Sequence, residues 1–357
     1  MPPANLMMAT QPANEKWLPD SRVGVETPLT AIARDSWTMT FVVSTRSIAV
    51  GILAGLASAL LVLSPVGGSI LAFPLTILIE LPLVIAALGW GTQAAIVGSL
   101  AGAGALLAIS PGLSLYLIVF LAPPAAVGGH LAGLFRRQDD APESSIEWYP
   151  LGRILFVVGL LVAAGAIIVS AVNGFDPSSI SPEQVHAIAA KYAEALGDAD
   201  TTLDAEQVTA LIEPTIATTL HVLPFAFTVI WTLIAAANLA LGLIITAKSG
   251  NLARPPENFS AVELPKPVTP LLGLALVASS IGGPFGSVAF AIAGSMAALL
   301  LIGGLAVLHT VTRGFLLRLP LLILVYLFIG LFAVPLVILG ALEPYLHLKQ
   351  RISLRKS

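Results

Sequence analysis

Residues 268–312 read VTPLLGLALVASSIGGPFGSVAFAIAGSMAALLLIGGLAVLHTVT, and this stretch holds no Asp, Glu, Lys or Arg. About 20 apolar residues suffice to cross the hydrocarbon core of a bilayer as a helix. The stretch is more than twice that length, and Gly282, Gly283 and Pro284 interrupt it. It therefore predicts two membrane helices, at residues 268–281 and 285–310, joined by a turn.

The rest of the chain has the same character. Hydrophobic residues make up 57% and charged residues 10% of the sequence, whereas soluble domains carry about 25% charged residues. Between Ser47 and Phe135, Glu80 is the single Asp, Glu, Lys or Arg. This composition predicts a protein that crosses a membrane many times, and it excludes a soluble enzyme and a protein with one anchor.

Charge and cysteine content exclude other classes. The formal net charge is -3 and the basic residues are dispersed among short loops, so nucleic acid is not an expected partner. The chain has no cysteine, which removes disulfides, thiolate metal sites and cysteine nucleophiles. We expect no metal and no cofactor.

Apolar runs between polar or Gly/Pro breaks predict an all-α bundle of eight or nine transmembrane helices. The candidate spans are residues 47–63, 68–88, 92–109, 112–135, 151–172, 216–247, 268–281, 285–310 and 319–342. We divide the chain into a flexible cytoplasmic tail (1–46), a six-helix membrane domain (47–247), a cytoplasmic loop (248–267), C-terminal membrane helices (268–342) and a basic tail (343–357).

The orientation in the membrane follows from Lys and Arg, because short loops rich in these residues stay on the cytoplasmic side. Residues 136–153 and 248–266 each carry three such residues, whereas residues 173–215 carry eight carboxylates and a lone Lys191. We therefore expect a bacterial inner-membrane protein with a cytoplasmic N-terminus and a periplasmic acidic insertion at 173–215. Nine spans would place the basic C-terminus outside. If residues 268–281 were re-entrant, eight spans would place the C-terminus inside but would expose Arg313 and Arg318 outside. The sequence therefore leaves eight and nine spans open.

The acidic insertion carries helix-start signals. Ser181, Pro182 and Gln184 provide an N-cap, a proline at the first helical position and a capping glutamine, which predicts a helix from Pro182 to about Leu196. A second helix is expected to start at Asp204. Together they predict an acidic helical hairpin.

Small residues line several predicted helices and favour close backbone approach in lipid. Gly51, Gly55 and Ala59 share one face of the first helix, and Gly98 and Gly102 share one face of the third. These positions predict helix packing within the chain or docking of a partner membrane subunit.

Polar residues at membrane depth are the candidate ligand-binding positions, because burying them in lipid is costly. Glu80 is followed by Leu81 and Pro82, and proline frees the carbonyl of Leu78 and weakens the helix there. An interrupted helix with a carboxyl could line a ligand cavity, as broken helices do in transporters. The alternative is that the run forms two short pieces with Glu80 near an interface, or that Glu80 is protonated and bonded to a neighbour. The other candidates are His130, Asn238 and His309, for which a structural hydrogen bond is the alternative.

Catalytic motifs are missing from the sequence: it contains no His-Glu-x-x-His, no Gly-x-Ser-x-Gly and no phosphate-binding Gly-x-x-x-x-Gly-Lys-Ser/Thr. We expect no catalytic residues and no ATP hydrolysis. Any transport would draw its energy from a gradient or from a partner.

Four motifs carry a family resemblance after Arg46. They are Ala87-Leu-Gly-Trp-Gly91, the inner-loop stretch from Ala237-Asn-Leu-Ala through Ser249-Gly-Asn-Leu-Ala-Arg-Pro255 to Leu264-Pro265, Gly303-Gly-Leu-Ala-Val-Leu-His309 and Leu339-Gly-Ala-Leu-Glu-Pro-Tyr-Leu-His-Leu-Lys349. With them the chain resembles the YybS-like family of bacterial multi-pass membrane proteins, which has no assigned function. The layout of the first six spans also resembles the substrate-binding S components of energy-coupling-factor transporters, although the large insertion and the C-terminal spans depart from that pattern.

The S-component resemblance implies binding or transport of a small solute, with Gly51, Gly55 and Ala59 docking a coupling subunit. The alternative is a non-transporting scaffold or assembly factor that acts through its basic loops. An intramembrane enzyme is the least favoured interpretation.

Overall fold

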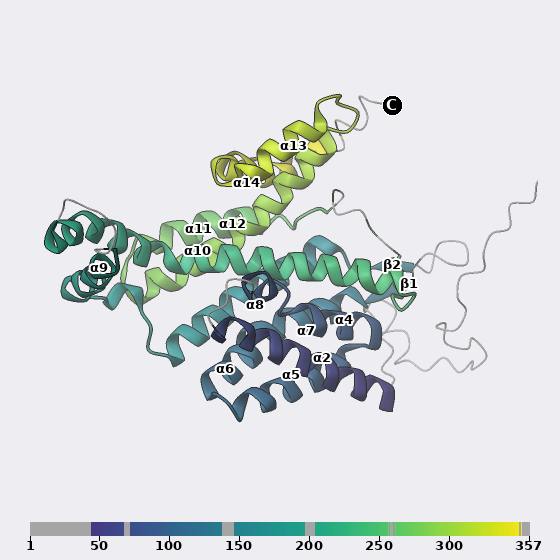
Figure 1. The fold of residues 1–357 in the computed structure, drawn as a ribbon. Helices are drawn as coiled ribbons and strands as arrows, with labels where there is room; N and C mark the ends of the chain where they lie inside the picture. Colours follow the sequence, from purple (N-terminus) through teal and green to yellow (C-terminus); the bar gives the residue numbers. More distant parts are fainter. Residues whose placement is uncertain are drawn as a thin grey trace, which may run out of the picture.

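The computed structural model describes residues 44–67, 72–137, 146–196, 204–255, 257, 260, 262–349 and 351. The predicted tail at 1–46 lies almost entirely outside this part of the chain. The fold is all-α apart from one short β-hairpin, as the sequence predicts (Figure 1). The main helices are α2 (Thr45–Leu63), α3 (Phe73–Thr76), α4 (Leu81–Trp90), α5 (Thr92–Leu107), α6 (Pro111–Leu115), α7 (Ala122–Ala132), α8 (Leu151–Val172), α9 (Pro182–Leu196), α10 (Ala205–Lys248), α11 (Val268–Ser279), α12 (Gly283–Val311), α13 (Arg318–Leu327) and α14 (Ile329–Leu346).

Six helical stretches of the described chain are long and apolar enough to cross a membrane, and four shorter apolar stretches accompany them. The six are Thr45–Leu63, Pro111–Ala132, Leu151–Val172, Ala205–Lys248, Gly283–Val311 and Ile329–Leu346. The chain is therefore a polytopic membrane protein.

The short helix α4 lies inside the first half of the bundle, where it packs against α2, α5, α7 and α10. Its residues Leu83 and Ala86 are fully buried. The packing is close on two sides: a Cβ added at Gly129 of α7 would lie 2.2 Å from the Cβ of Ala87, and one at Gly242 of α10 would lie 2.5 Å from Val84. A residue on α4 is therefore enclosed by protein.

The predicted small-residue face of α2 packs against α5. A Cβ on Gly55 would lie 1.9 Å from the carbonyl oxygen of Gly98, and a Cβ on Gly51 would lie 2.4 Å from that of Ala94. Gly102 completes the contact from α5, since its added Cβ would lie 2.6 Å from the Gly55 carbonyl oxygen. These glycines therefore pack α2 against α5 within the chain, which is the first of the two predicted roles. Docking of a partner subunit stays a prediction.

Helix α10 differs from the sequence prediction because the expected second insertion helix and the sixth span form one helix of 44 residues. Pro214 and Pro224 lie inside it without ending it, and residues 205–241 contain no glycine that would favour a break. At its start, Asp204 and Gln207 form a reciprocal capping box. Helix α9 packs beside this outer part of α10, and Ser181 and Gln184 make the predicted cap hydrogen bonds at its start.

Helix α12 joins the two halves of the bundle, and 78% of its most apolar stretch of 18 residues is buried. Thr228 of α10 donates to the carbonyl oxygen of Ala291 at 2.7 Å, and Thr232 donates to the hydroxyl of Ser295 at 3.0 Å. A Cβ at Gly294 would lie 2.3 Å from the Phe225 carbonyl oxygen. Hydroxyls and a glycine therefore bring α10 and α12 together.

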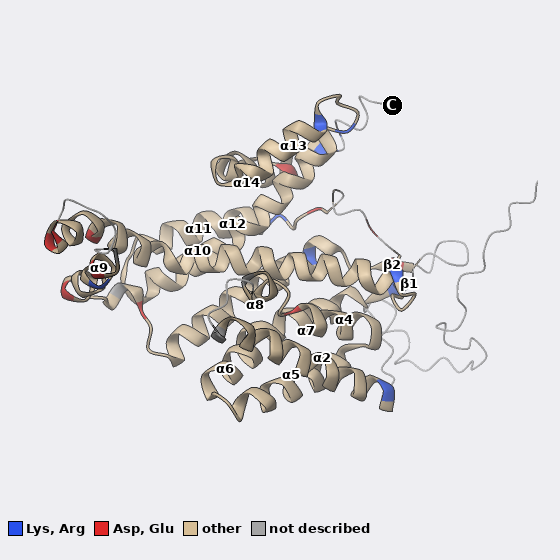
Figure 2. Cartoon of the chain, viewed as in Figure 1, with Lys and Arg blue, Asp and Glu red and all other residues tan. Residues whose placement is uncertain are grey.

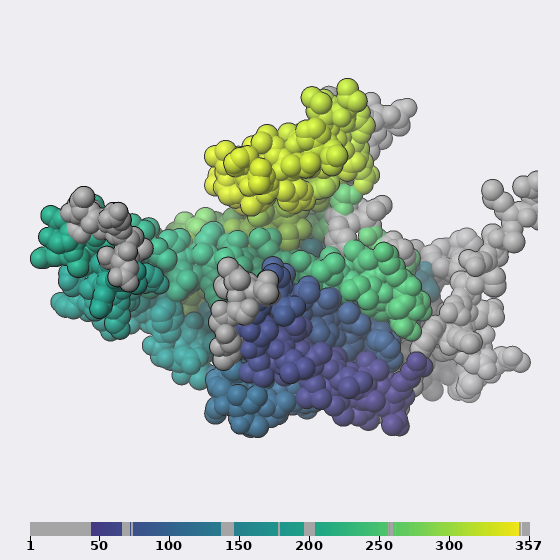
Figure 3. Space-filling view, in the orientation of Figure 1, coloured from purple at the N-terminus to yellow at the C-terminus, as the bar shows by residue number. Residues whose placement is uncertain are grey.

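The predicted span at 319–342 is not one helix. Phe328, with φ -112° and ψ 38°, separates α13 from α14, and Gly330 just beyond the break has low helix propensity. Helix α14 packs on α12 where Gly340 and Gly304 meet. The two C-terminal helices form a distinct lobe on one side of the bundle, which Figure 3 shows in yellow.

Both ends of the α13–α14 lobe contact the loop at residues 249–267. The end of α12 contacts the loop at residues 249–267 through Thr310, whose hydroxyl donates to the Ser260 carbonyl oxygen at 3.4 Å. The region after α14 contacts the same loop through Lys349, whose Nζ donates to the Val262 carbonyl oxygen at 2.6 Å. Arg313, which contacts Ser260, and Lys349 therefore lie on the same side as that loop, so the chain returns to it between the end of α12 and the end of α14.

Charged residues are segregated along the bundle (Figure 2). Acidic residues gather at α9, and basic residues gather at the opposite end of the first six helices, near β1 (Phe135–Arg137) and β2 (Ile146–Trp148). We call these the acidic end and the basic end. The β-hairpin was not predicted; its strands are antiparallel and Arg136 pairs with Glu147 at 2.7 Å.

Candidate functional site

The candidate site forms where the helix around Glu80 is interrupted. Because Pro82 has no amide hydrogen, the Leu78 carbonyl oxygen lacks its usual donor. In the structure the Leu81 amide donates to Leu78 at 3.1 Å instead. In a regular helix the Leu81 amide would donate to the carbonyl oxygen of Ile77. The carbonyl oxygen that lacks a backbone donor is therefore that of Ile77, one residue before the predicted Leu78.

Asn238 of α10 supplies the missing donor. Its Nδ2 donates to the Ile77 carbonyl oxygen at 2.7 Å and to the Ile234 carbonyl oxygen at 2.9 Å. Asn238 is 1% exposed, and its buried Oδ1 has no hydrogen-bond partner in the part of the chain that the structure describes. Both amide hydrogens are committed to backbone, so Asn238 presents a bare acceptor.

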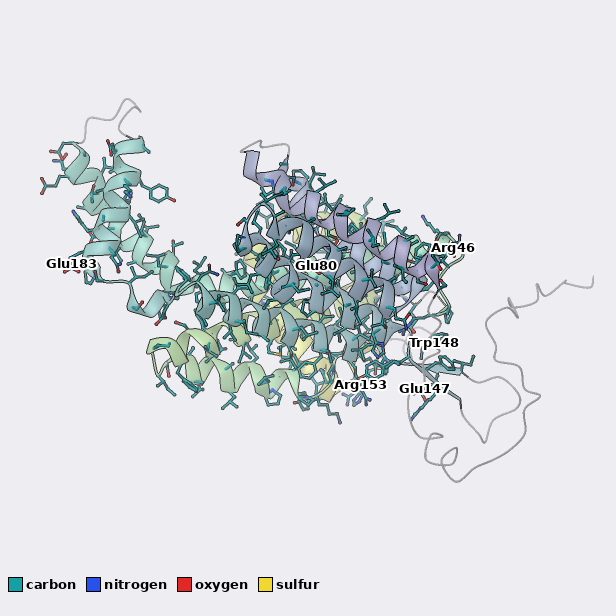
Figure 4. The ribbon with its side chains drawn as sticks, turned by 90° about the horizontal axis from the view of Figure 1, so that it is seen from below. Arg46, Glu80, Glu147, Trp148, Arg153 and Glu183 are labelled. Atoms are coloured by element: carbon teal, nitrogen blue, oxygen red, sulfur yellow. The ribbon has the colours of Figure 1, made fainter. Side chains whose placement is uncertain are left out.

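Glu80 lies at the end of the same interruption, as the residue before α4. It is 2% exposed, and Figure 4 shows it within the bundle, away from the charged residues labelled at either end. Among the described residues, no hydrogen bond to its carboxyl oxygens is formed. The break therefore holds a second buried acceptor group near Asn238.

Aromatic side chains flank these acceptors. Tyr116 lies within electrostatic range of Glu80 and belongs to a π-helical turn at Tyr116–Leu121. Its ring centroid is 5.2 Å from that of Phe120 and 6.0 Å from that of Trp231. Trp231 and Asn238 are seven residues apart and so share one face of α10. Asn238 thus reaches the break through the Ile77 carbonyl oxygen, and the aromatic cluster reaches it through Tyr116 and Glu80.

The two histidines predicted with Glu80 and Asn238 lie elsewhere. His130 Nδ1 and the Thr92 hydroxyl are 2.8 Å apart, which links α7 to the start of α5 near the basic end. His309 Nε2 and the Tyr326 hydroxyl are 3.0 Å apart, which links α12 to α13. The structure therefore separates the four candidates into three places, and a ligand role for either histidine stays a prediction.

Sequence reasoning missed Tyr116 and Trp231. A signal for Trp231 exists, since it precedes Asn238 by seven residues in the same predicted helix. For Tyr116 the sequence shows no such signal, because its neighbours at the site come from other helices. Among the described residues, no group of three or more His, Asp or Glu is placed to hold a metal ion.

Comparison with known protein families identifies the family of this chain. A family model described as Predicted membrane protein (DUF2232) matches residues 39–342. No curated protein and no solved structure matches the chain. The matched range includes every residue of the candidate site.

Proposed function

Since the chain belongs to this DUF2232 family of predicted membrane proteins, we propose that it binds a small solute inside the bundle, at the break between α3 and α4. The observation that carries the proposal is the buried Asn238 Oδ1, which has no hydrogen-bond donor among the described residues, at the same helix break as the buried Glu80 carboxyl. Buried polar groups are nearly always hydrogen-bonded, and leaving one unsatisfied costs about 1–3 kcal/mol. A bound solute with donor groups would satisfy both.

The architecture around the break supports the same function. Interrupted membrane helices commonly form the binding sites of transporters, because the freed backbone and side-chain groups face a cavity instead of lipid. The resemblance of the first six spans to S components points to the same class of activity. The finer identification as a YybS-like protein or an S component is part of this proposal.

Orientation in the bacterial inner membrane is also part of the proposal. The segregation of charge predicts that the basic end faces the cytoplasm and that the acidic end, with α9, faces the periplasm (Figure 2). With this orientation, the loop at 249–267 and Lys349, which contacts it, are both cytoplasmic.

Native mass spectrometry of the protein purified from its membrane tests solute binding. The parent is expected to carry a non-lipid small molecule, and Glu80→Gln is expected to lose it while keeping the helical content of the parent. Glu147→Gln is the matched control, because Glu147 is a half-exposed carboxylate of the β-hairpin and pairs with Arg136 outside the site.

Two outcomes contradict the proposal. One is a parent that carries no such molecule and is not stabilised by any compound of a broad solute library. The other is a molecule retained equally by the parent, Glu80→Gln and Glu147→Gln, which would place its binding elsewhere and favour a scaffold role for the break.

A further inference from the structure

We infer that the site at the α3–α4 break takes a monovalent cation, either an alkali ion or the ammonium group of a solute. The inference rests on the proposed binding site and names the charge of its ligand. It follows from the juxtaposition of one buried carboxyl, one bare amide oxygen and an aromatic cluster.

Charge balance within the bundle favours a cation at the site. Glu80 is the single Asp, Glu, Lys or Arg between Ser47 and Phe135, and residues 216–247 of α10 contain none. The surroundings therefore hold no fixed positive charge that could balance a carboxylate at this depth. An isolated buried charge is strongly disfavoured, so the charged form of Glu80 requires a positive partner that the chain itself does not supply.

The polar groups that the site offers to a ligand are acceptors. The amide hydrogens of Asn238 are both used, one on Ile77 and one on Ile234, so Asn238 offers only its Oδ1 to a ligand. An anion would meet the Glu80 carboxylate and an amide oxygen, and both would repel it. A cation would meet acceptors, which are the groups that coordinate alkali ions and that receive the hydrogen bonds of an ammonium.

The number of carboxyl groups at the site limits the charge of the ligand. The site contributes a single carboxyl, and the described chain places no group of three or more His, Asp or Glu together. One carboxylate neutralises one positive charge, and a divalent ion would leave an uncompensated charge in the bundle. The composition of the site therefore selects a charge of one.

The aromatic side chains make ammonium groups, as well as bare ions, suitable ligands for the site. Phe120 and Trp231 are 5.3 Å apart between ring centroids and Tyr116 lies against both, so the three rings form one cluster that meets the site through Tyr116, which interacts electrostatically with Glu80. Aromatic faces attract cations within about 6 Å of the ring centroid. The same two acceptors serve an alkali ion, and the rings favour an alkylammonium.

Thermal unfolding in detergent tests the inference with defined probes. Sodium, potassium, methylammonium and tetramethylammonium chloride are each titrated into the purified protein, with N-methyl-D-glucamine chloride keeping ionic strength and chloride constant. At least one probe is expected to raise the melting temperature of the parent with a saturable concentration dependence. Glu80→Gln is expected to abolish this shift, and Glu147→Gln is expected to keep it. An inorganic probe identifies a bare ion site, whereas a shift confined to the alkylammonium probes identifies an ammonium-bearing solute.

Equal melting temperatures in all five salts would overturn the inference, and so would a shift that Glu80→Gln retains in full. If Glu80→Gln does not yield folded protein, equilibrium binding of radioactive sodium and methylammonium to the parent decides, and absence of saturable binding of both refutes the site. The two proposals fail separately. A Glu80-dependent neutral or anionic molecule in native mass spectrometry would sustain solute binding and refute the cation, whereas a cation effect without any solute would do the reverse.

Discussion

The contact between α2 and α5 makes a quantitative prediction for Gly55→Ala. The added Cβ would lie 1.9 Å from the carbonyl oxygen, 2.6 Å from the carbonyl carbon and 2.9 Å from the Cα of Gly98. These atoms are backbone, so no side-chain rotation relieves the clash, and the two helices must move apart. Overpacking of this kind costs about 1–3 kcal/mol.

Gly104→Ala is the matched control, since Gly104 belongs to α5 and has open space within 4 Å of an added Cβ. Both substitutions gain up to about 1 kcal/mol of helix propensity from replacing glycine by alanine. The difference between them therefore isolates the packing contribution, and Gly55→Ala is expected to be less stable than Gly104→Ala by about 1–3 kcal/mol.

Reversible unfolding of the purified protein in mixed detergent and sodium dodecyl sulfate, followed by circular dichroism, measures this difference. A Gly55→Leu variant is expected to be less stable than Gly55→Ala, because a larger side chain enters the same contact. Equal stability of Gly55→Ala and Gly104→Ala would refute the close approach of α2 and α5.

Three further predictions address the site, the topology and the C-terminus. Asn238→Ala removes the donor to the Ile77 carbonyl oxygen, so it is expected to destabilise the protein by about 1–3 kcal/mol in the same unfolding assay, whereas Asn251→Ala in an exposed turn is expected to change little. A cysteine replacing Glu194 is expected to react from the periplasm, and one replacing Ser249 from the cytoplasm, with a membrane-impermeant thiol reagent; the opposite pattern would reverse the proposed orientation. Burial lowers the pKa of the Lys349 ammonium below its ordinary value of 10.5, although Glu343 and Glu263 oppose the effect. The folded state therefore holds this proton less tightly than the unfolded chain, so the free energy of unfolding should rise as pH increases through the alkaline range up to about 10.5, relative to Lys349→Gln; parallel pH curves for both proteins would contradict this.

Local features of the sequence predicted most of the helices. The bounds of α8 agree with the predicted 151–172, because hydropathy ends sharply at Pro150 and Asn173. The caps at Ser181 and Asp204 were also predictable, since an N-cap and its third helical residue are neighbours in sequence. The weak point of the helix before Pro82 follows from covalent chemistry alone.

Features that depend on contacts between distant residues were not predictable in the same way. Asn238 and Ile77 are 161 positions apart, so the donor that stabilises the break could not be identified from either segment. The division of residues 319–342 into α13 and α14 was missed for a related reason: the apolar run is continuous, and hydropathy does not register a backbone break within it. Of the candidate site, the sequence identified Glu80 and Asn238 separately, whereas their proximity and the aromatic cluster required the fold.

The length of α10 has a mechanical consequence. Its 44 residues correspond to about 66 Å of helix, roughly twice the thickness of the hydrocarbon core. One continuous rod therefore carries Asn238 near one end and supports α9 near the other, so a tilt of about 5° around the inner end would displace the outer end by about 6 Å. The same tilt moves Asn238, about 15 Å from the inner end, by only about 1 Å. Spin labels placed on α9 and on α2 would therefore report a small rearrangement beside the helix break as a larger distance change, which pulsed electron paramagnetic resonance can measure.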